Sequence, residues 1–209
     1  MVKQNLQKGV TLVELMVVIF IFVVVASVLM FNFSDFSTNV SVRNLAQDIA
    51  LSVRKAQSYA TSVRSINDSG MTSNQFPAYG LSFSVDSDNN TYAPNPKQFI
   101  LFADIGTPTN SQYDRGANCG SPAAGDECVE SFGITSADKI VLICPDNNCT
   151  NTGTVNIMFH RPVPDADICV MSGGSCQSTK PSSVKIVIES AKGLRRNITV
   201  WNTGQISVD

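Results

Sequence analysis

Apolar residues are concentrated near the beginning of the chain. Residues 15–31 are apolar except for Ser27. As an α-helix this run would be roughly 26 Å long at about 1.5 Å per residue, which is the short limit for crossing a bilayer. Including residues 10–13 makes the run long enough, but it then contains Glu14. A lone acid in a membrane helix costs on the order of 3 kcal/mol, so Glu14 normally needs a partner.

A helical pattern continues beyond this run. No glycine or proline occurs between Gly9 and Gly70, so the usual helix breakers are absent. After residue 31 apolar residues recur mostly every three or four positions, at Phe33, Phe36, Val40, Leu45, Ile49, Val53, Ala56, Ala60 and Val63. This spacing is typical of one buried face of an amphipathic helix. We predict a single helix over about residues 10–65, buried first in lipid or a filament and then against a globular domain.

Beyond Gly70 the apolar period changes to two, which is typical of strands. The predicted strands are residues 79–85, 97–103, 139–144, 154–160, 184–189, 197–202 and 206–208. Residues 86–90 read as a turn and 191–194 as a hairpin connection. The loop over residues 104–132 is too long for a simple connection, so we expect an additional interaction to hold it in place. The expected fold class is therefore α+β, with a mostly antiparallel β domain packed on the outer half of the helix.

Composition narrows the class of protein. The chain of 209 residues has a formal net charge of −2, a pI of about 5.3, 43% hydrophobic residues and 15% charged residues. A globally basic nucleic-acid binder is excluded, although a local basic patch is not. The chain is also too apolar and too weakly charged to be disordered. Its length fits one domain, or one domain plus an appendage.

Six cysteines follow the apolar run, on the side where disulfides persist. They fall into three close pairs, and sequential pairing is our prediction: Cys119–Cys128, Cys144–Cys149 and Cys169–Cys176. Other connectivities remain open. Each bridge would close a small loop and contribute about 2–3 kcal/mol. Their spacing lacks C-x-x-C and no histidine is nearby, so we expect no metal site and no cofactor.

Three readings compete for the N-terminus. A cleaved secretory signal fits poorly because the apolar core is long and no A-x-A site follows. A plain signal anchor is the second reading. The third rests on the string KGVTLVELMVVIFIF, which resembles the N-terminus of type IV pilins and type II secretion pseudopilins. The features in common are Lys8-Gly9, the pair Thr11-Leu12, Glu14 and the long apolar helix that follows.

This resemblance implies cleavage by a prepilin peptidase between Gly9 and Val10, and N-methylation of Val10. Most members have phenylalanine where this chain has Val10. Glu14 would pair with the α-amine of Val10 on a neighbouring subunit, because two charges that are costly alone in lipid can neutralise each other. The implied domains are a leader (1–9), a transmembrane or filament-core helix (10–33), an amphipathic helix (34–65) and a β-rich head (66–209).

Lys3 and Lys8 indicate a cytoplasmic N-terminus and a head outside the cytoplasm, by the positive-inside rule. The resemblance therefore implies a single-pass inner-membrane precursor that later enters a pilus or pseudopilus. Its partners would be other pilin subunits, the prepilin peptidase and the inner-membrane assembly platform. The implied role is structural and not enzymatic.

The layout also resembles one branch, the pseudopilin H/FimT-type minor pilins. This resemblance rests on Tyr79-Gly80, the run of residues 193–200 and Thr203-Gly204. It implies a minor subunit. Alternatives are a DNA-binding minor pilin for DNA uptake, a major pilin, or a membrane-anchored protein of unrelated function.

The C-terminal hairpin is locally positive although the whole chain has a net negative charge. Between residues 180 and 201 there are five basic residues and a single acidic residue, Glu189. DNA-receptor minor pilins use basic residues in this region, which makes Lys192, Arg195 and Arg196 candidate phosphate contacts and Trp201 a candidate stacking platform. The alternative reading is a solvated hairpin edge whose charges prevent edge-to-edge pairing.

Two weaker patterns point to ordinary structure. His160 lies in no recognisable catalytic motif, so a surface or capping role is the better interpretation. The spacing of Asp86, Asp88 and Asn90 matches the first positions of a calcium-binding loop. The sixth and twelfth positions, which are Gly and Glu in such a loop, are Thr91 and Lys97 here. A polar β-turn is the better interpretation there.

Overall fold

The computed structural model of this protein describes residues 9–62, 76–86, 93–105, 110–114, 119, 126–151, 153–172 and 174–209. Residues 1–8 of the expected leader, the expected helix end near residue 65, and Asp88, Asn90 and Thr91 lie outside the described residues. The chain divides into two compact units, residues 1–39 and 40–209. We call the second unit the head.

One helix and ten strands make up the secondary structure of the described residues. They are α1 (Leu12–Thr61), β1 (Ala78–Ser84), β2 (Gln98–Asp104), β3 (Cys128–Gly133), β4 (Lys139–Pro145), β5 (Thr154–Phe159), β6 (Ala166–Ser172), β7 (Ser175–Cys176), β8 (Ser183–Glu189), β9 (Arg195–Trp201) and β10 (Ile206–Val208). The helix begins two residues later than the sequence predicts because Thr11 is its cap: the Glu14 N–H donates to Thr11 Oγ1 at 3.2 Å.

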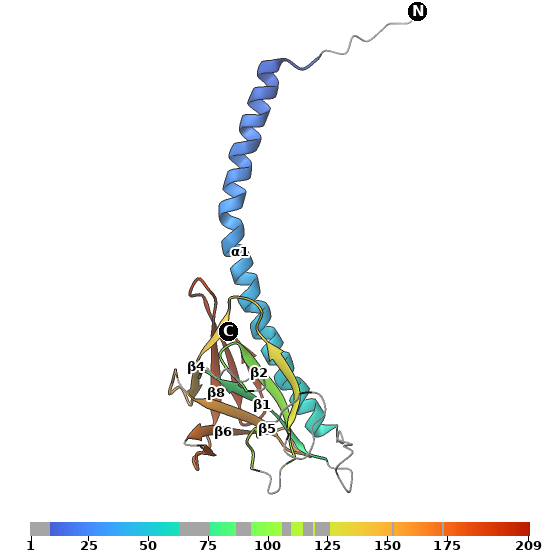
Figure 1. The fold of residues 1–209 in the computed structure, drawn as a ribbon, viewed down its shortest axis with the longest axis vertical. Helices are drawn as coiled ribbons and strands as arrows, with labels where there is room; N and C mark the ends of the chain where they lie inside the picture. Colours follow the sequence, from blue (N-terminus) through green and yellow to red (C-terminus); the bar gives the residue numbers. More distant parts are fainter. Residues whose placement is uncertain are drawn as a thin grey trace, which may run out of the picture. The chain divides into compact units, whose positions relative to one another are not determined.

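The strands of the head form two antiparallel sheets (Figure 1). One has six strands in the order β3-β2-β1-β5-β6-β7, and the other has four in the order β10-β9-β8-β4. All seven strands predicted from the sequence are present with small shifts of their ends, and every pairing is antiparallel as expected. The hydrophobic pattern did not predict β3, β6 and β7.

The second half of α1 packs on both sheets in one continuous core. Its buried residues are Val42, Ala46, Ile49, Ala50, Val53, Ala56 and Ala60. Four of these seven are alanines, whose small side chains allow the sheets to approach the helix closely. The predicted face was wrong at its beginning: Phe36 is 67% exposed and Val40 is 38% exposed. Steps of four and five residues along the predicted stripe drift away from the 3.6-residue period, so Val42 and Ala46 occupy the core instead.

The six-stranded sheet is covered on its other face by loops. Ile100, Phe102, Cys128 and Met158 form a second small core there, with Tyr113 and Cys119 packed against it. The loop after β2 therefore lies against this face at Tyr113 and Cys119, and the Cys119–Cys128 bridge bonds it to β3.

Candidate functional site

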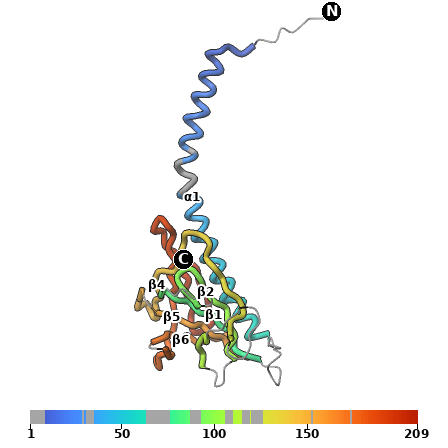
Figure 2. The backbone as a smooth tube through the Cα atoms, in the orientation of Figure 1, coloured from blue at the N-terminus to red at the C-terminus, as the bar shows by residue number. Residues whose placement is uncertain are grey.

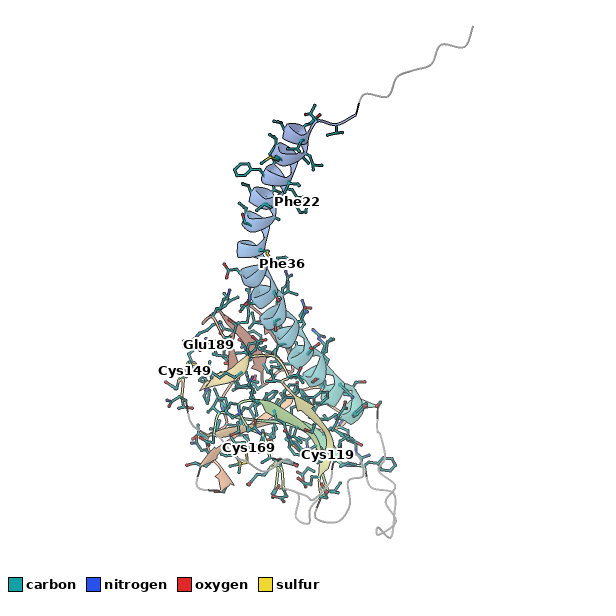
Figure 3. All side chains as sticks on the ribbon, turned by 45° about the horizontal axis from the view of Figure 1, so that its top comes forward. Phe22, Phe36, Cys119, Cys149, Cys169 and Glu189 are labelled. Carbon is teal, nitrogen blue, oxygen red and sulfur yellow. A yellow bond between two sulfur atoms is a disulfide. The ribbon has the colours of Figure 1, made fainter. Side chains whose placement is uncertain are left out.

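The apolar first part of α1 has no partner within the described chain. From Val10 to Met30 the large hydrophobic side chains that are described are 46–80% exposed. Figure 3 shows Phe22 among side chains that point away from the helix axis on every side. Monomeric soluble proteins rarely expose contiguous apolar patches of more than a few hundred Å². This surface therefore requires cover from outside the chain.

The residues expected at the processing and assembly site stand together at the start of this helix. Gly9, Val10 and Glu14 are all exposed, and, apart from the two neighbours of Gly9 in the chain, no described residue lies within 4 Å of a Cβ built on it. Glu14 also stands in the first turn of α1, where an acidic side chain favourably opposes the helix dipole. This cap was not predicted, although the T-x-x-E spacing of Thr11 and Glu14 is the usual sequence signature of an N-terminal helix cap.

Over residues 4–30 the chain matches the family model of the prokaryotic N-terminal methylation motif. This match supports the type IV pilin-like family. It points to a pilin-like protein that a prepilin peptidase processes, and to a structural role rather than an enzymatic one. No curated protein and no solved structure gives a significant match to the chain.

The pilin-type motif also supports a membrane-anchored precursor that later enters a pilus, and assembly with other pilins. Among the described residues, no helix is long and apolar enough to span a membrane. The single-pass span expected over residues 10–33 stays a prediction. The same holds for the pseudopilin H/FimT-type branch.

Three disulfides join Cys119 to Cys128, Cys144 to Cys149 and Cys169 to Cys176. They lie at separate places around the head, where Figure 3 labels one cysteine of each. The first anchors the long loop to β3, the second closes the hairpin that follows β4, and the third closes the β6–β7 hairpin. The described residues contain no cluster of His, Cys, Asp and Glu that could hold a metal ion.

The basic residues of the C-terminal hairpin do not form one patch. The hairpin turn projects at the edge of the head (Figure 2) and carries Lys192. Arg195 Nε donates to Glu189 Oε2 at 2.7 Å, which reduces the charge that Arg195 could offer a ligand. Arg195 and Arg196 are neighbours in β9, so their side chains leave opposite faces of the sheet. DNA binding through this hairpin stays a prediction without a structural observation in its favour.

Two buried carboxylates, neither of them predicted from the sequence, hold the loop after β2. Glu127 accepts hydrogen bonds from the N–H groups of Ile105 at 3.2 Å and Asp114 at 2.8 Å. Asp104 Oδ2 accepts one from the Ser111 N–H at 3.0 Å. Burial raises the pKa of both groups, that of Glu127 to about 7, although these hydrogen bonds act in the opposite direction. The Glu127 and Asp104 carboxylates and the Cys119–Cys128 bridge therefore fix the long loop to the sheet.

His160 lies at the end of β5 and belongs to a small ionic cluster. Its Nε2 is 3.8 Å from Asp167 Oδ2, and the Lys180 ammonium is 2.7 Å from the same oxygen. These partners lower the pKa of Asp167, and the interaction with His160 makes the largest contribution. Asp86, the described member of the calcium-type pattern, accepts a hydrogen bond from the Gly153 N–H at 2.9 Å. Both contacts are ordinary surface interactions that connect loops to strands.

Proposed function

We propose that this protein is a structural subunit, a minor pilin or a pseudopilin, of a type IV pilus or a type II secretion pseudopilus. The observation that carries the proposal is the apolar beginning of α1. It stands exposed in the isolated chain and coincides with the methylation motif. A surface of this kind needs one cover in the precursor and another in the assembled state. Lipid supplies the first, and the same helix of neighbouring subunits supplies the second.

Processing prepares the helix for assembly. Cleavage between Gly9 and Val10 removes Lys3 and Lys8 and creates a new α-amine close to the first turn of α1. The positive charge of that amine attracts the Glu14 carboxylate of an adjacent subunit. Two charges that are expensive alone in an apolar medium become acceptable as a pair. Such pairing sets the axial register between subunits, while the disulfide-bonded head remains on the outside.

The mature N-terminus tests this proposal first. We expect intact mass and N-terminal sequencing of the protein, taken from cells with an active prepilin peptidase, to give a chain that begins at N-methyl-Val10. A chain that still begins at Met1 would make the protein an ordinary signal-anchored protein and would overturn the proposal.

Two variants separate assembly from helix capping. Glu14→Gln removes the charge that would pair with the amine, whereas Thr11→Ala removes the cap and keeps that charge. We expect Glu14→Gln to be cleaved normally but reduced at least about tenfold in sheared filaments, since an unpaired amine in an apolar core costs more than the ~1.4 kcal/mol that a factor of ten requires. Thr11→Ala loses about 1 kcal/mol of local helix stability and should still assemble. Equal incorporation of Glu14→Gln and the unaltered protein would refute the pairing role of Glu14.

A further inference from the structure

Six asparagines in the sequence begin the tripeptide Asn-x-Ser/Thr, with x other than proline: Asn32, Asn39, Asn67, Asn89, Asn148 and Asn197. This tripeptide is the acceptor sequence for N-linked glycosylation of exported proteins. The tripeptide that begins at Asn148 stands in the run Asp146-Asn147-Asn148-Cys149-Thr150.

This run forms a tight exposed hairpin after β4. Asp146 and Asn147 occupy its turn with φ values of 44° and 67°, the backbone conformation that two-residue hairpins favour and that Asp and Asn tolerate. The Asn148 N–H donates to the Pro145 carbonyl at 2.8 Å. Ile143 and Thr150 exchange two backbone hydrogen bonds of 3.0 and 2.9 Å. With Cys144 bonded to Cys149, the acceptor run is held in a single geometry at the surface.

The two side chains that a transferase recognises are exposed together. Asn148 and Thr150 are separated by one residue along an extended segment, so their side chains lie on the same side of it. Both are exposed and both line a cavity of about 300 Å³ beside Val170, Gln177 and Pro181. The Thr150 hydroxyl makes one long hydrogen bond, 3.2 Å to the Ile143 carbonyl. The described residues provide no hydrogen bond to the Asn148 amide.

The acceptor tripeptides that begin at Asn39 and Asn197 already make contacts within the fold. Asn39 donates its amide to the Asp35 carbonyl at 2.9 Å, and Ser41 donates its hydroxyl to Asp138 at 2.6 Å. Both residues also stand within α1, where a tripeptide cannot extend. Asn197 pairs with Val187 on one side of β9 and with Asp209 on the other, and its Thr199 is buried.

We propose that Asn148 is an acceptor site for N-linked glycosylation in the oxidising compartment where the three disulfides form. The donor is an oligosaccharide joined to a polyprenyl lipid through a diphosphate. The Asn148 Nδ2 atom forms a C–N bond with the anomeric carbon of the first sugar, and the C–O bond from that carbon to the diphosphate breaks. The lipid diphosphate leaves, and the proton lost by the amide passes to a carboxylate of the transferase. No oxidant or reductant is required.

Co-expression of the full-length protein with a periplasmic oligosaccharyltransferase and its lipid-linked donor tests the site, with peptide mass spectrometry as the readout. We expect one glycan per chain on the peptide that contains Asn148, complete loss in Asn148→Gln, and no change in Asn197→Gln.

An unmodified chain, in cells that glycosylate a standard acceptor protein, would overturn this proposal, as would a glycan that persists in Asn148→Gln. The proposal requires only that the head lies outside the cytoplasm. A chain cleaved at Val10 but not glycosylated would contradict the acceptor site alone, whereas a glycosylated chain that keeps Met1 would contradict the pilin-type proposal alone.

Discussion

The Glu127 carboxylate accepts a hydrogen bond of 2.8 Å from the backbone N–H of Asp114, thirteen residues earlier in the chain. Glu127 is 1% exposed, and burial raises its pKa from the ordinary 4.5 to about 7, with the negative charge of Asp104 adding to the rise. The loop after β2 is therefore held by a carboxyl group that changes protonation near neutral pH. This contact makes the stability of the head dependent on pH.

We expect the head to be less stable at pH 8 than at pH 5. Because the pKa of Glu127 is raised in the folded state, the folded state binds more protons than the unfolded state above pH 4.5. Stability therefore falls as pH rises through this window, and the loss is complete just above pH 7. The expected difference between pH 5 and pH 8 is about 2–3 kcal/mol. Thermal unfolding followed by Trp201, the single tryptophan, measures it within the head.

The variant Glu127→Gln is the control for this prediction. It removes the titrating group, so the difference between the two pH values should shrink even though the variant is less stable overall. The pKa of Asp167 is lowered by its partners, which gives an opposite loss of stability below about pH 4. An unfolding temperature that rises from pH 5 to pH 8 in the unaltered protein would contradict the assignment to Glu127.

Gly204 allows a close contact between the β9–β10 turn and the segment before β6. Its φ is +77°, and a Cβ at this position would overlap the Pro164 carbonyl oxygen and lie 2.7 Å from Gln57 Nε2. Gly193 has nearly the same φ, +79°, but nothing lies within 4 Å of its Cβ position. We expect Gly193→Ala to cost about 1 kcal/mol from backbone strain alone and Gly204→Ala to cost about 3 kcal/mol or more because the turn must move. Urea unfolding of both variants gives the difference, and equal costs would exclude the steric contribution.

The two faces of α1 within the head should differ sharply in their response to truncation. Ile49 is fully buried in the main core, whereas Leu51 is 63% exposed. Ile49→Ala should cost about 2–5 kcal/mol, and Leu51→Ala should change the free energy of unfolding by less than about 0.5 kcal/mol. Both variants shorten an aliphatic side chain in the same helix, so helix propensity is nearly matched. A large loss for Leu51→Ala in the dispersed monomer would show that this face packs differently.

Local patterns predicted most of the elements because each depends on residues close in sequence. The period of two in β1, β2, β8 and β9 is evident without tertiary information. β6 has the same alternation, with Ala166, Ile168 and Val170 toward the main core, but the sequence prediction places no strand there. β3 (Cys128–Gly133) begins within the segment predicted as a loop over residues 104–132, where no turn signal marks its start. Both strands become recognisable only through pairing with β5 and β2.

The site at the N-terminus was accessible from sequence for the same reason, since Gly9, Val10, Thr11 and Glu14 form one contiguous motif. The buried carboxylates were not. Glu127 and Asp104 are satisfied by backbone N–H groups of a loop whose path the sequence does not specify. The separation of Arg195 from Arg196 also depends on strand geometry: counting charges along the chain suggests one basic patch, and alternation across β9 divides it.

Asp138 connects α1 to the beginning of β4 through a buried carboxylate. Its Oδ2 atom accepts hydrogen bonds from the hydroxyls of Ser41 on α1 at 2.6 Å and Ser136 at 2.7 Å, and the residue is 2% exposed. Hydrogen bonds to a charged group contribute about 1.5–3 kcal/mol each, and a serine deprived of its acceptor can turn elsewhere, whereas an unpartnered buried carboxylate cannot. We therefore expect Ser41→Ala and Ser136→Ala together to destabilise the head more than Asp138→Ala does. Urea unfolding of the three proteins, followed by Trp201 fluorescence, measures the order, and the reverse order would show that the carboxylate finds other partners when its hydroxyls are removed.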